Sequence, residues 1–183
     1  MLSLLFKGMT KDDITQGFHQ NHGGWDLVEH STARGKLYGT PLCAPEDCLV
    51  LYINGDGFTP NSNEHLANGY GIKLRGKETG LEYLFWHCLP IFPVWGGDSV
   101  KRGQIVAYMG NAGYVTVGGK LVPIEERTTD PEPGTHLHLE VYKKGFQIDP
   151  VSLFNWDLQP QYGTSDIIKA ALVVAQKIIK RIK

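Results

Sequence analysis

The sequence contains few cysteines, almost no net charge and no long apolar run. Its 183 residues include three cysteines, 18 Lys and Arg, and 19 Asp and Glu. No stretch approaches the roughly 18 apolar residues of a membrane-spanning helix. The balance of charge gives no general attraction to nucleic acid, so we expect no nucleic-acid partner. The apolar residues 1–6 end at Lys7, well short of a secretory h-region, so we expect no signal peptide.

Three cysteines do not make a disulfide framework, and an odd number is typical of a reducing compartment. Cys43 and Cys48 flank residues 44–47, a segment that contains Pro45 and is expected to turn. Such a turn places the two thiols opposite each other, and the sequence leaves open whether they pair. Their spacing differs from CxxC, which argues against a cysteine zinc site.

Glycine and proline are abundant, at 22 and 10 residues, and they separate runs rich in Val, Ile, Tyr and Leu. This pattern predicts a mainly β fold of antiparallel sheets. Residues 69–75 and 81–87 are expected to form a hairpin, and residues 100–110 a turn followed by a buried strand. The segments 54–68 and 111–133 are long and polar, and loops of this length are often functional.

Two histidines separated by one residue lie in the strand-like run 134–141. Because strand side chains alternate between faces, His136 and His138 share one face and Leu137 and Leu139 the other. The leucines are expected in the core, which leaves two imidazoles about 7 Å apart on the opposite face. One ring can bind a divalent ion while the other moves a proton. The alternative is a pair of surface histidines on a half-exposed strand.

A second group of polar side chains lies in the glycine-rich segment 19–26. His22 and Asp26 are four residues apart, but Gly23 and Gly24 make a helix improbable there. On a loop that enters a strand at Trp25, a nitrogen and a carboxylate oxygen can converge, a donor pair that suits zinc. The alternative is an ordinary turn closed by a hydrogen bond that the Asp26 side chain accepts from the backbone.

The remaining histidines and one glutamate have simpler interpretations. His87 ends a predicted strand, where it is a packed residue, a surface residue or a catalyst. His19 or His30 could replace a proposed ligand, although His19 is expected to be an unbonded loop residue, and His65 is expected to be solvated. Glu140 falls on the histidine face by parity. It either contacts an imidazole or is an ordinary surface glutamate, and the second interpretation is favoured.

The end of the chain differs from the rest in charge. Residues 157–164 contain Pro160 and Gly163 and are predicted to be a linker, and Ser165 can cap a helix over residues 165–183. This segment has five basic residues and one acid. Its apolar positions recur at spacings of three and four: Ile167, Ile168, Ala171, Leu172, Val174, Ala175, Ile178, Ile179 and Ile182. Such a helix suits contact with an anionic membrane, or packing on its own domain or a second copy.

The order of these motifs resembles the lysostaphin-type (LytM-like) zinc endopeptidases. That family has an early H-x-x-x-D, here His22 to Asp26, and a late H-x-H, here residues 136–138. Between them it has a strand ending in a Tyr-x-His-like element, which residues 83–87 resemble with two extra residues. Short segments at residues 39–41, 69–71, 100–104 and 149–150 also resemble the framework of this family. The resemblance covers residues 14–154 and does not reach the basic tail.

This resemblance implies a zinc endopeptidase domain over residues 14–156, preceded by a lead at 1–13. It implies that His22, Asp26 and His138 bind one zinc ion with an open place for water, and that His136 and His87 are the catalytic helpers. One helper takes the proton of the attacking water, and the other hydrogen-bonds the oxyanion; the sequence does not assign them.

The family cleaves the cross-bridges or stem peptides of bacterial peptidoglycan in an open groove walled by long loops. The long segments 26–39, 54–68 and 118–133 depart from the family pattern and affect the expected specificity more than the expected chemistry. We expect a phage endolysin or a similar antimicrobial lytic factor, made in the cytoplasm and acting on the wall after release. The alternative is a catalytically silent module that binds peptidoglycan or activates an amidase.

Overall fold

The computed structural model describes residues 1–27, 37–55 and 68–182. His30, His65 and most of the long segments 26–39 and 54–68 lie outside this part of the chain, so the expectations for them are not tested. No helix among the described residues is long and apolar enough to cross a membrane.

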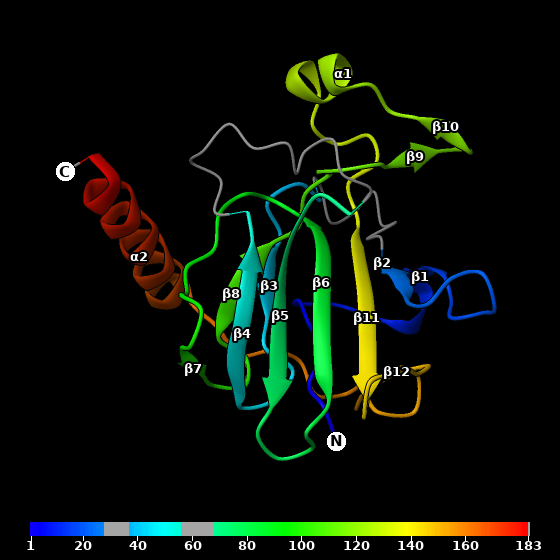
Figure 1. Cartoon of the computed structure of the whole chain (residues 1–183), viewed down its shortest axis with the longest axis horizontal. Coiled ribbons are helices and arrows are strands. Elements are labelled where there is room, and N and C mark those ends of the chain that lie inside the picture. Colours follow the sequence, from blue (N-terminus) through cyan, green and yellow to red (C-terminus); the bar gives the residue numbers. More distant parts are fainter. Residues whose placement is uncertain (28–36, 56–67, 183) are drawn as a thin grey trace.

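The centre of the molecule is an antiparallel sheet, in agreement with the predicted mainly β class (Figure 1). Its strand order is β1-β2-β11-β6-β5-β4-β7, and the short β12 pairs with β11. The bounds are β1 (Ile14–Gln16), β2 (Trp25–Leu27), β4 (Cys48–Asn54), β5 (Tyr70–Gly76), β6 (Glu82–Cys88), β7 (Ser99–Val100), β11 (Leu137–Lys143) and β12 (Phe146–Gln147). A short 3-10 helix, η1 (Lys11–Asp13), precedes β1.

The β5–β6 hairpin is confirmed, because its strands pair antiparallel across the short turn that the glycines indicate. On β11, Leu137, Leu139 and Val141 are fully buried, as the alternation predicts. The register places His138 opposite Asp26 on β2 and opposite Trp86 on β6. Strand pairing therefore joins three segments that are distant in the sequence.

A second, two-stranded sheet consists of β3 (Pro41–Cys43) and β8 (Ile105–Tyr108). The chain turns at residues 44–47 as expected, but the turn does not pair the strands on either side of it, because β3 pairs with β8 while β4 pairs with β5 and β7. The segment between them hydrogen-bonds to the turn before β8: Ala44 N–H donates to Gln104 O, and Gly103 N–H donates to Ala44 O. Cys43, Cys48 and Cys88 are buried and free. Cys43 and Cys48 therefore do not form a disulfide in this structure.

The N-terminal segment contributes to the same core as the sheet. Leu4, Leu5, Phe6 and Met9 are fully buried in the main hydrophobic cluster. Leu2 forms a parallel bridge with Phe154, at the other end of the domain sequence. The first residues are therefore part of the packed domain.

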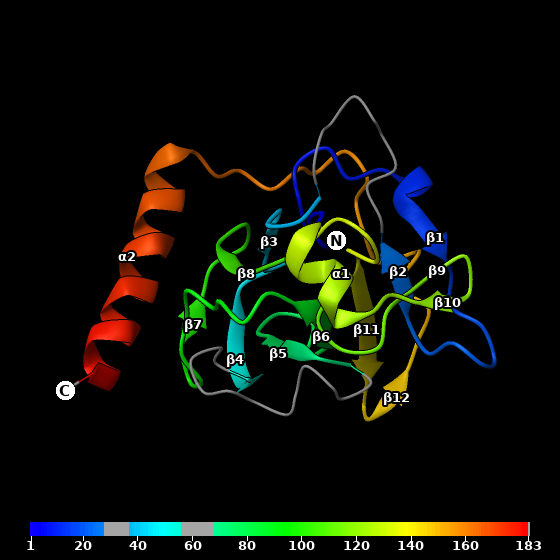
Figure 2. The ribbon, with the colours of Figure 1, turned by 90° about the horizontal axis from the view of Figure 1, so that it is seen from above.

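The polar excursion before β11 is folded, which the sequence did not indicate. It contains the hairpin β9 (Thr116–Val117) and β10 (Lys120–Leu121), followed by α1 (Ile124–Thr129). These elements lie beyond one end of the main sheet, near the start of β11 (Figures 1 and 2). The buried Arg127 side chain of α1 donates hydrogen bonds to the carbonyl oxygens of Asn111, Gly113 and Val122. One guanidinium thus fastens α1 to the start of this excursion and to the residue that follows β10.

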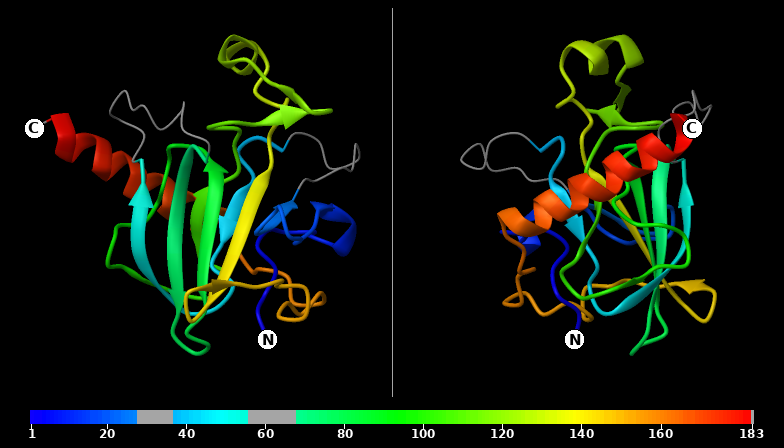
Figure 3. Two further views of the ribbon diagram at one scale, coloured as in Figure 1. Left: turned by 45° about the vertical axis from the view of Figure 1, so that its right-hand side comes forward. Right: turned by 90° about the vertical axis from the view of Figure 1, so that its left-hand side faces the viewer.

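The C-terminal helix α2 (Thr164–Ile182) lies at one edge of the molecule, beyond β4 and β7 (Figure 3). The sequence suggested Ser165 as the N-cap. This prediction is wrong, because the helix begins at Thr164 and Ser165 lies inside it. The backbone N–H of Gly163 instead donates to the Asp166 carboxylate at 2.9 Å. An acidic group in the first turn also complements the helix dipole.

Candidate metal centre

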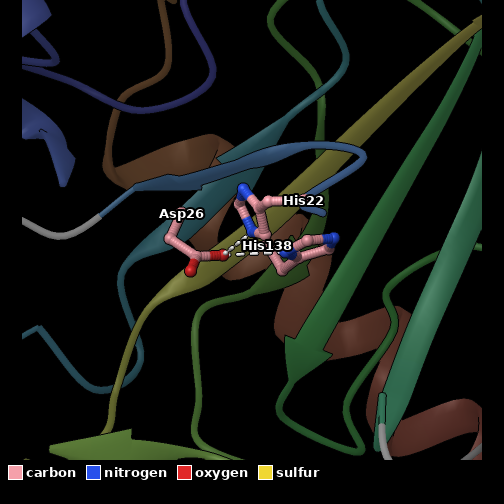
Figure 4. Close-up of side chains that lie close together, drawn as sticks. All are labelled: His22, Asp26 and His138. Atoms are coloured by element: carbon pink, nitrogen blue, oxygen red, sulfur yellow. Dashed lines mark hydrogen bonds and ion pairs between the residues drawn. The ribbon is translucent and has the colours of Figure 1, made fainter. Parts of the chain in front are cut away.

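The five residues singled out in the sequence meet in one open hollow of about 490 Å³ at the junction of β2, β6 and β11. His22, Asp26 and His138 each offer a ligand atom, and these atoms all lie within 4.8 Å of one another. The side chains converge from a loop and two neighbouring strands (Figure 4). The lining also includes Thr15, Gln16, Asn68, His87, Tyr114, Val115, Thr116 and His136.

Asp26 is held by its strand partner. His138 Nδ1 lies 2.7 Å from Asp26 Oδ1 across the β2–β11 pairing. Burial raises the pKa of Asp26, but the hydrogen bond from His138 and the charges of His136, His138 and His22 outweigh it and leave the pKa below the ordinary value. Asp26 is therefore an ionised oxygen donor.

His22 is oriented by the backbone of its own loop. Reciprocal bonds between the N–H and C=O groups of His19 and His22 close the loop, and His22 Nδ1 lies 3.0 Å from Gly17 O. Donation from Nδ1 to that carbonyl leaves Nε2 without a proton, and Nε2 lies 3.3 Å from Asp26 Oδ1. His19 lies outside the ligand cluster, but it is not unbonded as expected. Its ring contacts Asn21 N and Gln16 Nε2.

The second nitrogen of His138 faces Glu140. Glu140 Oε1 lies 3.5 Å from His138 Nε2 and accepts a hydrogen bond from Trp86 Nε1 at 3.1 Å. Its Oε2 accepts bonds from Tyr142 and Gln147. Glu140 is 8% exposed, so the interpretation as an ordinary surface glutamate is wrong.

The two carboxylates together favour a cation at His138. Burial opposes the charged ring, but the hydrogen bonds with Asp26 and Glu140 raise the pKa of His138 to about 9. Burial likewise raises the pKa of Glu140, and its hydrogen bonds from His138, Tyr142 and Gln147 prevail and lower it to about 2. A positive charge is favoured here, carried either by a proton on His138 or by a metal ion.

The residues fit a zinc ion. Two imidazole nitrogens and one carboxylate oxygen are a common donor set for catalytic zinc. Bonds of about 2.0–2.1 Å in a tetrahedron place ligand atoms roughly 3.3 Å apart. Asp26 Oδ1 lies 2.7 Å from His138 Nδ1 and 3.3 Å from His22 Nε2. His22 and His138 are each oriented at their other nitrogen, by Gly17 and Glu140, as metal-binding histidines usually are.

His87 and His136 form a neutral pair beside these ligands. Their ring centroids are 4.5 Å apart. His87 Nδ1 lies 2.7 Å from Ala112 O, and His136 Nδ1 lies 2.8 Å from Gly134 O, so each Nε2 is the nitrogen without a proton. Burial lowers the pKa of both rings, that of His87 to about 3. Both histidines are therefore uncharged proton acceptors at neutral pH.

The backbone of His87 is unusual. Its φ is +58°, a left-handed conformation that non-glycine residues rarely adopt. Strained residues of this kind often occur at functional sites, where the surrounding structure holds them in place. His87 is the penultimate residue of β6, and its ring lies against Ala112 O and the ring of His136. Tyr114, Val115 and Thr116 were missed by the sequence reasoning, because they line the hollow only through the fold of the excursion that contains β9.

The model of peptidase family M23 matches residues 21–150, a range that includes all five residues. The chain belongs to peptidase family M23. The M23 domain has the fold of LytU, whose solved structure is 23% identical with a TM-score of 0.53; the match covers 77% of this chain and 83% of that one. No curated protein matches the sequence.

Two larger proteins contain the same fold. The antimicrobial peptidase lysostaphin from Staphylococcus simulans is 21% identical with a TM-score of 0.50, over 81% of this chain and 48% of that one. Csd3 from Helicobacter pylori is 17% identical with a TM-score of 0.52, over 98% of this chain and 40% of that one. The M23 chain spans less than half of either protein, and at these identities the likeness establishes the fold alone.

Proposed function

We propose that this M23 peptidase is a zinc-dependent endopeptidase that hydrolyses cross-bridges or stem peptides of bacterial peptidoglycan. The observation that carries the proposal is the meeting of three ligand atoms and two neutral histidines in one open hollow. Three protein ligands leave a coordination place free, as catalytic zinc sites require.

In this proposal, His22, Asp26 and His138 hold the metal. When bound, zinc supplies Lewis acidity toward the scissile carbonyl and lowers the pKa of a water molecule to about 7. The chain's own contribution is to orient these ligands through Gly17 and Glu140 and to accept the proton that the attacking water loses.

We assign the proton transfer to His136. Its Nε2 lies 3.8 Å from Asp26 Oδ1, and that negative charge favours the protonated ring while the proton is carried to the leaving amine. Burial lowers the pKa of His87 to about 3, and its Nδ1 donates a hydrogen bond to Ala112 O. Its Nε2 therefore suits accepting a hydrogen bond from the water better than donating one to the oxyanion.

The substrate class rests on the family and on the fold shared with lysostaphin, an antimicrobial peptidase. The hollow is open to solvent, and its lining includes Tyr114 and Thr116 from the excursion before β11 and Thr15 and Gln16 from β1. We further propose that the protein is a lytic factor of the endolysin kind, made in the cytoplasm and acting on the wall after release. Lysis of whole cells exposed to the purified protein from outside tests that role.

The decisive experiment digests purified peptidoglycan with the wild-type chain, His138→Ala and the control His19→Ala. Zinc content is measured on all three, and new amino termini are identified. We expect about one zinc per chain and new termini for wild type and control, and neither for His138→Ala. Zinc without cleavage in the wild type favours the silent module that binds the wall or activates an amidase. A wild type that binds no zinc overturns the site assignment.

A further inference from the structure

Helix α2 rests on the domain through a narrow face. Its buried residues are Ala170 and Lys177, with Val173, Val174 and Ile178 half-buried on the same side. Ala170 packs in a small cluster with Cys43 and Ile105. These positions recur at spacings of three and four, so they define one side of the helix.

The most specific contact of this inner face is made by a lysine. Lys177 is 6% exposed, and its Nζ donates hydrogen bonds to the carbonyl oxygens of Phe92, at 2.9 Å, and Val94. The same ammonium lies 4.4 Å from the ring centroid of Trp95. The side of α2 that packs on the domain therefore contains a buried charged side chain, and it is not the side that carries most of the apolar stripe.

Much of the apolar stripe nevertheless faces away from the domain. Ile168, Leu172 and Ile179 are 54%, 58% and 55% exposed, and Ala171 and Ala175 between them are also exposed. Their spacings of three, four and seven place them on one side of α2, which we call the outer row. Of the alternatives raised by the sequence, packing on its own domain holds only for Val174 and Ile178, and it leaves Ile168, Leu172 and Ile179 uncovered.

The charge around the outer row favours an anionic partner. Lys169 and Lys180 are exposed along its edge. Lys169 pairs with Asp166, the one acid of residues 165–183, and the Lys180 ammonium lies 5.4 Å from the Trp95 ring centroid. A helix with an apolar face and a basic edge is typical of segments that lie in the interface of a membrane. Association of two such helices brings like charges together, so a second copy is the less complementary partner.

The position of α2 agrees with such contact. In two perpendicular views the helix lies at one side of the molecule, while β1 and β2, which carry part of the hollow, lie at the other (Figures 1 and 2). A surface that covers the outer row leaves the hollow accessible.

We propose that the outer row and its lysines dock the protein on an anionic lipid bilayer, with α2 in the headgroup region. This goes beyond peptide cleavage, because it assigns a second binding surface that uses neither the metal ligands nor the hollow. Attraction of each lysine to anionic lipid and burial of the apolar row act together, so neither is expected to suffice alone.

The test is flotation of the full chain with vesicles of phosphatidylcholine alone and of phosphatidylcholine with phosphatidylglycerol. We expect binding to the anionic vesicles, weakened by salt, and at most weak binding to the neutral ones. Leu172→Glu is expected to lower the partition coefficient by about tenfold or more, because it places a carboxylate in the apolar contact. Phe146→Glu is the matched control, since Phe146 is 76% exposed on β12, away from the outer row.

A charge-reversal pair separates the electrostatic part. Lys180→Glu is expected to weaken binding to anionic vesicles, and Lys144→Glu, in the turn after β11, is expected to leave it unchanged.

The proposal is overturned if wild type does not bind anionic vesicles, or if Leu172→Glu and Phe146→Glu bind equally. A dimer in sedimentation that Leu172→Glu dissociates, without vesicle binding, assigns the row to a second copy instead. Cleavage of purified wall by Leu172→Glu is expected to match wild type, so failure here and failure of the proposed peptidase activity are distinguishable.

Discussion

Glu140 Oε1 lies 3.5 Å from His138 Nε2, and Asp26 Oδ1 lies 2.7 Å from Nδ1 of the same ring. The imidazole is therefore held at both nitrogens. If Asp26 and His138 Nδ1 share a metal ion, Nε2 must keep its proton, and Glu140 is the acceptor that favours this tautomer. Glu140 is a positioning residue, because it acts through His138.

Glu140→Gln is expected to weaken zinc binding by about 10–100-fold. The amide is nearly the same size, but it lacks the charge that orients His138. Its NH2 group also meets the donors of Trp86, Tyr142 or Gln147 in a buried place. Competition with a chromophoric chelator measures the affinity. Glu82→Gln, a carboxylate on β6 that pairs with Lys73 and Arg75, is the control; equal affinities for the two variants contradict the positioning role.

Gly24→Ala is expected to separate β2 from β11. A Cβ at this position lies 2.4 Å from the carbonyl oxygen of Leu139 and 3.0 Å from His138 Nε2, and the backbone oxygen cannot move without moving its strand. We expect a loss of about 1–3 kcal/mol in the free energy of unfolding, as for overpacked cores, with a drop in zinc affinity. Urea denaturation and the chelator assay measure both.

Gly17→Ala is the matched control for this change. A Cβ there meets nothing within 4 Å, and Gly17 lies at the entrance to the same loop. If Gly24→Ala has the same stability and zinc affinity as Gly17→Ala, the prediction is contradicted. The contact between β2 and β11 is then looser than the structure indicates.

His136→Ala is expected to retain zinc and to lower kcat for cross-bridge cleavage by about 10²–10⁴, the usual contribution of a general base. The ring donates to Gly134 O and is not among the three ligands, so its removal leaves the ligand geometry in place. Zinc content and cleavage rates are measured on the same preparation. Loss of zinc makes His136 a ligand, and an unchanged rate moves the base role to His87.

Local patterns predicted the parts of the site that depend on one strand or one turn. The alternation along residues 136–139 placed His136 and His138 on one face, and Leu137 and Leu139 on the other face are buried. The burial of Glu140 was not predictable in this way. Parity gave its face, but its partner Trp86 comes from β6 through a register that non-local pairing sets.

The same limit applies to α2. Helical periodicity shows which residues share a side, but it does not say which side meets the domain. That choice is made by the carbonyl oxygens of Phe92 and Val94, which accept the Lys177 ammonium from another part of the chain. An apolar stripe is ordinarily the packed side of a surface helix, so this orientation required the structure.

His87→Asn is expected to reduce the acid sensitivity of the fold. Burial first, and then the charge of His136, lower the pKa of His87 to about 3 from an ordinary value of 6.5. Below pH 6.5 the unfolded chain binds a proton that the folded chain refuses, so stability falls as the pH drops from about 6.5 toward 3. For one such group the slope is at most about 1.4 kcal/mol per pH unit.

Asparagine does not titrate, and it tolerates the φ of +58° better than other residues of its size. Urea unfolding at pH 4.5–6.0, with a chelator present throughout, is therefore expected to give a shallower fall in stability for His87→Asn than for wild type. The interval pH 8–9 is the internal control, because His87 is neutral there in both states and the two slopes must agree. If the two proteins lose stability in parallel below pH 6, His87 takes up its proton in the folded chain, and its ring is more accessible to water than its contacts with Ala112 and His136 imply.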